Sequence, residues 1–178
     1  IRPGEYELNP AMPPADILAK LMAGRVVLHA VTIPEGYTMA QIADVLAQHQ
    51  VTDRAEFLRL VKDKNFIKTL GISAETLEGY LYPDTYRFPK PVPAKDVIRT
   101  MVEQLNQVVT PEWQARAKDI HLTFHQVLTL ASVIEKETAS GEERPQISSV
   151  FHNRLHKKIP LQSDPTVIYG LPNFDGNL

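Results

Sequence analysis

Apolar residues along the chain either alternate with polar ones or recur at helical spacing, and each change of period marks an expected element. The alternation at residues 5–8 predicts a short strand, and residues 13–22 predict a helix that Gly24 terminates. The β-branched run at residues 26–33 predicts a second strand. A capping-box pattern at residues 38–41 indicates that a helix begins at Thr38.

Helical periodicity dominates the rest of the chain. It predicts further helices that begin at Thr52 and Ala94, at the capping box of residues 123–126, and at about Gln146. Residues 159–178 predict loop and short strand. The proline-rich stretch 89–93 is the candidate boundary, so the sequence predicts an α+β protein with one domain over residues 1–88 and another over residues 89–178.

Composition narrows the possible functions. The 178 residues include 19 Lys and Arg against 21 Asp and Glu, a formal net charge of −2 that argues against nucleic-acid binding driven by charge. The absence of Cys excludes disulfides, thiolate nucleophiles and zinc fingers. No apolar run is long enough to span a membrane. The chain begins at Ile1 without an initiator Met, and we interpret it as part of a longer protein whose anchor segment precedes Ile1.

Other candidate chemistry is weak. The pairs His121/His125 and His152/His156 have the spacing of helical metal ligands, but they lie on polar faces without the Glu of a zinc protease motif, so we expect solvated histidines and no metal. Ser163 stands outside any nucleophile-elbow motif, which leaves serine hydrolase chemistry unsupported.

Two carboxylates on the helix predicted from Thr123 to Ala139 carry the clearest chemical signal. At about 100° per residue, Glu135 falls in the middle of the apolar face and Glu137 on its flank. Burial raises the pKa of an unpaired carboxyl, and an acid protonated near neutral pH is what cleavage of a glycosidic bond requires. The alternative is that both carboxylates pair with Arg144 or Lys136 and only stabilise the fold.

The same helix carries a family resemblance. Residues 131–139 read Ala-Ser-Val-Ile-Glu-Lys-Glu-Thr-Ala, which resembles the signature of the endolytic murein transglycosylase (MltG, YceG-like) family. Matching motifs follow in order at residues 143–144, 150–155 and 160–170, and an upstream match covers residues 77–86. The resemblance therefore extends over about the whole chain.

The resemblance implies that Glu137, the second Glu of Glu-Lys-Glu-Thr, is the catalytic residue. Periodicity instead favours Glu135 as the more buried carboxylate. We choose Glu137 because a catalytic group must reach a cleft, and we expect Glu135 to orient a partner or to raise the pKa of Glu137 through like-charge coupling.

The family's reaction needs no cofactor. Protonated Glu137 would donate to the oxygen between MurNAc and GlcNAc and then accept the proton of the MurNAc C6 hydroxyl, which closes a 1,6-anhydro ring. We expect Asn153, Gln162 and Asp164 to line the substrate cleft, unless Asn153 is a helix cap and Asp164 begins a turn. A hydrolytic muramidase with Asp164 as second carboxylate is a further alternative.

Residues 31–43 resemble the opening of a LysM module, a binder of N-acetylglucosamine polymers, although an ordinary βα packing unit explains the same pattern. The resemblance thus implies a LysM-like module followed by a mostly helical, lysozyme-like domain that continues beyond Gly170, so the cleft in this chain is expected to be incomplete. It also implies an inner-membrane protein facing the periplasm, with peptidoglycan strands as substrate and peptidoglycan synthases as partners. The competing hypothesis is a non-catalytic peptidoglycan-binding or scaffold protein.

Overall fold

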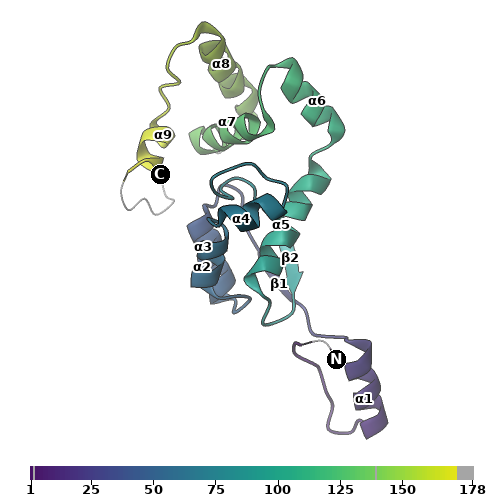
Figure 1. The fold of residues 1–178 in the computed structure, drawn as a ribbon. Coiled ribbons are helices and arrows are strands. Elements are labelled where there is room, and N and C mark those ends of the chain that lie inside the picture. Colours follow the sequence, from purple (N-terminus) through teal and green to yellow (C-terminus); the bar gives the residue numbers. More distant parts are fainter. Residues whose placement is uncertain (2, 139, 172–178) are drawn as a thin grey trace.

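The computed structural model describes residues 1, 3–138 and 140–171, and its elements fall into three groups (Figure 1). Helix α1 (Pro14–Ala23) stands apart at one end. A central body contains the strands β1 and β2 and the helices α2 to α5. Helices α6 to α9 lie at the other end of the molecule.

Helix α1 begins and ends close to where the sequence predicts. Pro14 occupies the first helical position, where no N–H donor is needed, and Gly24 closes the helix in the left-handed conformation (φ 62°). None of the α1 residues is buried. The strand predicted at residues 5–8 is wrong: the Glu5 carbonyl accepts one backbone hydrogen bond, from Val27 N–H (2.8 Å), but residues 5–8 form no strand and belong to neither strand of the sheet.

The sheet consists of β1 (His29–Thr32) and β2 (Thr85–Phe88), which pair antiparallel with Val31 opposite Tyr86. Val31 and Tyr86 point into the core, as the period-two pattern requires. The strand predicted at residues 26–33 is shorter than expected because pairing with β2 extends over only four residues.

Three short helices follow β1: α2 (Met39–Gln48), α3 (Arg54–Leu60) and α4 (Lys64–Thr69). Each begins at a side-chain cap, since Thr38, Asp53 and Asp63 all accept hydrogen bonds from backbone N–H groups of the first turn. The capping box at Thr38 is confirmed. Helix α4 was not predicted, because Ile67 is its only buried residue and six residues carry no recognisable period.

Helix α5 (Ala94–Val108) packs its apolar face into the same core as the sheet and α2 to α4. Val92 N–H donates to the carbonyl of Val51 (2.9 Å), so the proline-rich segment 89–93 is tied to the body. The core extends from Val31 to Val109, and the boundary predicted between residues 88 and 89 therefore lies inside it. The division into a binding and a catalytic part stays a prediction.

The remaining helices are α6 (Pro111–Asp119), α7 (Phe124–Glu137), α8 (Arg144–Lys157) and α9 (Asp164–Tyr169). The capping box at Thr123 and the helices predicted from Thr123 and from about Gln146 are confirmed to within a few residues. Helices α6 and α9 were not predicted. Helix α9 lies where loop and short strand were expected, and residues 172–178 of that stretch fall outside the described residues.

The helices with their small antiparallel sheet agree with the predicted α+β class. The finer assignments, a LysM-like module and a lysozyme-like domain, stay predictions. Among the described residues, no helix is long and apolar enough to cross a membrane.

Candidate active site

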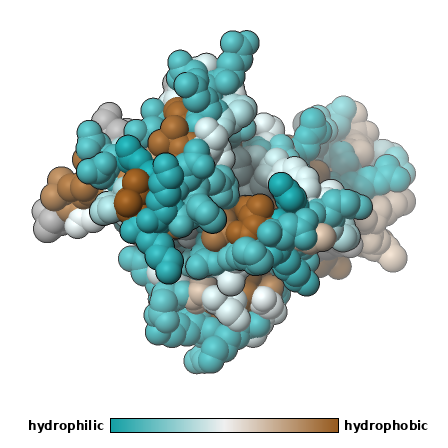
Figure 2. Space-filling model, turned by 90° about the horizontal axis from the view of Figure 1, so that it is seen from above, coloured by the Kyte–Doolittle hydropathy of each residue, from teal (hydrophilic) through white to brown (hydrophobic). Residues whose placement is uncertain are grey.

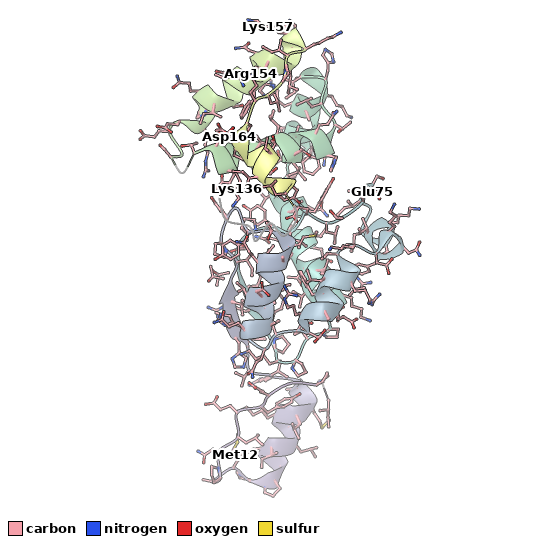
Figure 3. All side chains as sticks on the ribbon, turned by 90° about the vertical axis from the view of Figure 1, so that its left-hand side faces the viewer. Met12, Glu75, Lys136, Arg154, Lys157 and Asp164 are labelled. Atoms are coloured by element: carbon pink, nitrogen blue, oxygen red, sulfur yellow. The ribbon has the colours of Figure 1, made fainter. Side chains whose placement is uncertain are left out.

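A groove of about 950 Å³ separates the central body from helices α7 and α9. One wall comes from the loop at residues 33–38 and from residues 74–83, and the other from α7 and from the α9 residues Pro165, Thr166 and Tyr169. Figure 3 shows Lys136 where the body meets the helices above it, whereas Arg154 and Lys157 lie at the far end of α8.

The groove lining mixes carboxylates with aromatic rings: Glu35, Glu75, Glu78, Glu135, Tyr37, Tyr82, Trp113 and Tyr169. Figure 2 looks onto the α7 to α9 end and shows a mostly hydrophilic surface with small, separate hydrophobic patches. Carboxylates accept hydrogen bonds from hydroxyl groups, and aromatic rings offer flat apolar faces with polar edges. Such a lining suits an extended polar ligand with apolar ring faces.

Glu135 lies on the groove side of α7 and pairs with Arg144. The Arg144 Nη2 atom is 3.0 Å from Glu135 Oε1 and 2.9 Å from Oε2, and it is also 3.8 Å from Glu35 Oε2. The alternative supposed that both carboxylates pair with Arg144 or Lys136, and of this the pairing of Glu135 with Arg144 is confirmed. The side chain of Glu135 is 29% exposed, so the pair is partly shielded from water.

Glu137 is the last residue of α7, and its side chain is exposed. The hydroxyl of Ser163, which is only 2% exposed, donates a 2.8 Å hydrogen bond to Glu137 Oε2. The expectation that both carboxylates project from a mostly apolar surface is therefore wrong for Glu137. The reason is that Leu130 is the one buried residue of α7, so little covers the end of the helix.

The structure places the predicted substrate-binding residues in two locations. Gln162 and Asp164 flank Ser163, which brings them to the Glu137 side of α7, and both are exposed. Asn153 is exposed and lies inside α8, so its alternative role as a helix cap is wrong. Asp164 begins helix α9 and not the isolated turn that the alternative supposed. The binding roles themselves stay predictions.

The hydrogen bond between Ser163 and Glu137 lies outside the lining of the groove. Of the five predicted site residues, the described lining of the groove includes Glu135, whereas Glu137, Asn153, Gln162 and Asp164 lie outside it. Glu137 is two residues from Glu135, which is about 200° of rotation around the helix axis, so the two carboxylates point to different sides of α7.

Glu78 is a site residue that the sequence analysis missed. Its carboxylate accepts a hydrogen bond from Met39 N–H (3.1 Å) and another from the Tyr169 hydroxyl. Burial raises the pKa of Glu78, and these two hydrogen bonds and the positive charge of Lys62 oppose the shift. The sequence places Glu78 in the family match at residues 77–86, but this aromatic, turn-rich segment has no period that indicates the surroundings of Glu78.

A second contact also joins the body to α7. The Tyr80 hydroxyl lies 2.9 Å from His125 Nδ1, and the two rings stack with centroids 5.9 Å apart. Burial raises the pKa of Tyr80. His125 thus has a specific partner and is not simply solvated. Among the described residues, no three His, Asp or Glu side chains are grouped so that they could hold a metal ion.

Known proteins resemble this chain over most of its length. It is 35% identical to an endolytic murein transglycosylase of Bacillus subtilis over 93% of the chain, and 33% identical to one of Streptococcus pneumoniae over all of it. A crystal structure of a yceG-like protein from Listeria monocytogenes superposes with a TM-score of 0.72 at 36% identity and covers 94% of the chain.

The chain spans only part of these proteins: 50% of the Bacillus protein, 37% of the Streptococcus protein and 61% of the Listeria chain. The YceG-like family itself matches residues 1–178, the full extent of the sequence. The family resemblance carried by residues 131–139 is therefore confirmed, and the chain belongs to the YceG-like family.

Proposed function

We propose that this chain is part of an endolytic lytic transglycosylase, which cleaves the β-1,4 bond between MurNAc and GlcNAc within peptidoglycan strands and leaves 1,6-anhydro-MurNAc ends. Membership of the YceG-like family and the names of the relatives support this activity. We further propose an inner-membrane protein that faces the periplasm, with peptidoglycan synthases as partners.

Glu135 and Glu137 have different surroundings on α7, and this difference is the reason for choosing Glu137 as the acid. Arg144 engages both oxygens of Glu135, so neither is available to present a proton to a ligand. Glu137 is exposed, and the contact with Ser163 engages only Oε2. Oε1 of Glu137 is then the oxygen that carries the catalytic proton.

In the proposed reaction, protonated Glu137 donates to the glycosidic oxygen as the bond to C1 of MurNAc breaks. The resulting carboxylate accepts the proton of the C6 hydroxyl, whose oxygen bonds to C1 and closes the 1,6-anhydro ring. The Ser163 hydroxyl holds the carboxylate in one orientation during both proton transfers. No water is consumed and Glu137 regains its proton.

The groove supplies the binding surface in this proposal. The exposed rings of Tyr37 and Trp113 stack on sugar faces, while Glu135, Asn153, Gln162 and Asp164 contact hydroxyl or N-acetyl groups at either side of Glu137. The LysM-like part adds affinity for N-acetylglucosamine. No cofactor or metal takes part.

The decisive experiment compares wild type with Glu137→Gln and with the control Glu103→Gln, which neutralises an exposed carboxylate on α5. Each intact protein digests purified murein, and mass spectrometry identifies the chain ends. We expect 1,6-anhydro ends from wild type and from the control, and none from Glu137→Gln. Anhydro ends from Glu137→Gln at the wild-type rate would refute the assignment of the acid.

Two alternatives give different products. Because the groove lining includes Glu135 and not Glu137, a non-catalytic peptidoglycan-binding module is the second candidate, and it predicts murein binding with no new chain ends. A hydrolytic muramidase predicts reducing ends without the anhydro ring, and these would disappear in Asp164→Asn.

A further inference from the structure

Helix α9 makes a specific hydrogen bond near each of its two ends. At its beginning, the N-cap residue Ser163 donates to Glu137 Oε2 at 2.8 Å. At its end, the hydroxyl of Tyr169 donates to the Glu78 carboxylate in the central body. The helix has six residues and is about 9 Å long, so the two contacts lie at opposite ends of one short helix.

The two hydrogen bonds matter for the position of α9 because little of the helix is buried. None of the residues of α9 is buried, although Ser163 just before it is. Apolar burial therefore fixes the helix only weakly, and individual hydrogen bonds decide its position more than they do in a packed core.

Glu78 is a firm anchor for the far end. Its carboxylate caps the N-terminus of α2 through Met39 N–H, where the helix dipole also favours a negative charge. Lys62 adds a favourable charge interaction. Burial and the charge of Glu78 raise the pKa of Tyr169, so its hydroxyl remains a donor at neutral pH.

We propose that Glu78 is a positioning residue for Glu137: by binding Tyr169 it fixes the far end of α9 and so holds the Ser163 hydroxyl against the Glu137 carboxylate. The inference rests on the proposed function of Glu137. It assigns to the central body a role in catalysis that is separate from substrate binding, because the anchor Glu78 belongs to the central body whereas the catalytic carboxylate belongs to α7.

The test removes each contact in the intact protein. Tyr169→Phe deletes the hydroxyl alone, and Glu78→Ala deletes its acceptor. The matched controls are Tyr6→Phe, beside α1, and Glu56→Ala, on the exposed face of α3. Activity is the rate at which anhydro ends are released from murein.

We expect kcat to fall about tenfold in Tyr169→Phe and Glu78→Ala with a smaller change in KM, since a displaced catalytic group costs rate more than affinity. Both controls should retain wild-type kcat. An effect on KM alone would overturn the proposal, because Tyr169 would then serve only to bind substrate.

A double-mutant cycle tests the route through Ser163. If the anchor acts through this residue, Tyr169→Phe lowers kcat much less in a Ser163→Ala background than in wild type. Equal loss in both backgrounds would show that the Tyr169 contact acts independently of Ser163 and would refute the inference.

Hydrogen exchange supplies a readout that needs no catalysis. The amides of Thr166 and Gly170 donate within α9, and their exchange should accelerate about fivefold in Tyr169→Phe and Glu78→Ala, the effect of losing one hydrogen bond. If the exchange of these amides is unchanged in both variants, the proposed anchoring of α9 by Glu78 is refuted, even if the activity falls. Conversely, faster exchange in a protein that cleaves no murein would leave the anchor standing and refute the proposed function.

Discussion

The Nη2 atom of Arg144 lies within 3.0 Å of both carboxylate oxygens of Glu135 and thereby joins the start of α8 to the last turn of α7. The same guanidinium is 3.8 Å from Glu35, in the loop between β1 and α2. One side chain thus connects the central body with helices α7 and α8. This contact supports the proposal that Glu137, and not Glu135, is the acid.

Replacing Arg144 by Gln should lower the free energy of unfolding by about 1 kcal/mol, because the partly shielded carboxylate of Glu135 loses its counter-ion. Arg144→Lys should not recover the loss, since an ammonium group cannot reproduce the planar guanidinium geometry. Urea denaturation followed by circular dichroism measures both. The control Arg116→Gln removes an exposed pair 3.6 Å apart and should change stability by less than about 0.5 kcal/mol. Equal effects at positions 144 and 116 would contradict the special role of Arg144.

Glu78→Gln should change how stability depends on pH. Burial raises the pKa of Glu78, so the folded protein binds this proton more tightly than the unfolded chain does. The stability from this group is complete below the unfolded value of about 4.5 and is lost as the pH rises through the raised folded value. Relative to Glu78→Gln, wild type should therefore lose stability over the pH range that begins at about 4.5 and extends through the raised folded pKa. Melting temperatures measured for both proteins across this range test the sign, and a constant difference would contradict it.

Thr123→Ala should destabilise α7 by about 1 kcal/mol, because it removes the capping acceptor for Gln126 N–H. Thr129→Ala is the matched control within the same helix. Its hydroxyl donates to the carbonyl of His125, and Ala is the better helix former, so its effect should be near zero or slightly stabilising. Amide exchange in the first turn of α7 reports the difference locally. Similar exchange in the two variants would mean that the cap contributes nothing.

Phe57→Ala should cost about 3–5 kcal/mol, since Phe57 is completely buried in the central core. Leu18→Ala should cost less than about 0.5 kcal/mol, because Leu18 is 54% exposed on the isolated helix α1. Denaturant titrations of the two variants compare these costs directly. A large effect at Leu18 would indicate that α1 packs against the body in solution.

Local signals made much of the fold predictable. The capping boxes at Thr38 and Thr123 involve groups three residues apart, so the residues that start α2 and α7 are visible in the sequence. Helix α9 lacked any such signal: it buries no side chain, and its N-cap Ser163 makes no capping hydrogen bond. The pairing of Glu135 with Arg144, nine residues apart, was one of two alternatives that the sequence left open.

The sequence by itself determined the starts of helices such as α2 and α7, the α+β class and the family, since these depend on residue order and on contacts within a few residues. Only the tertiary structure decided which carboxylate meets which partner. Ser163 reaches Glu137 across 26 residues, and Glu78 reaches Met39 across 39. Such contacts arise from how the helices pack in space, because hydrogen-bond donors and acceptors select their partners by distance and direction and not by separation along the chain.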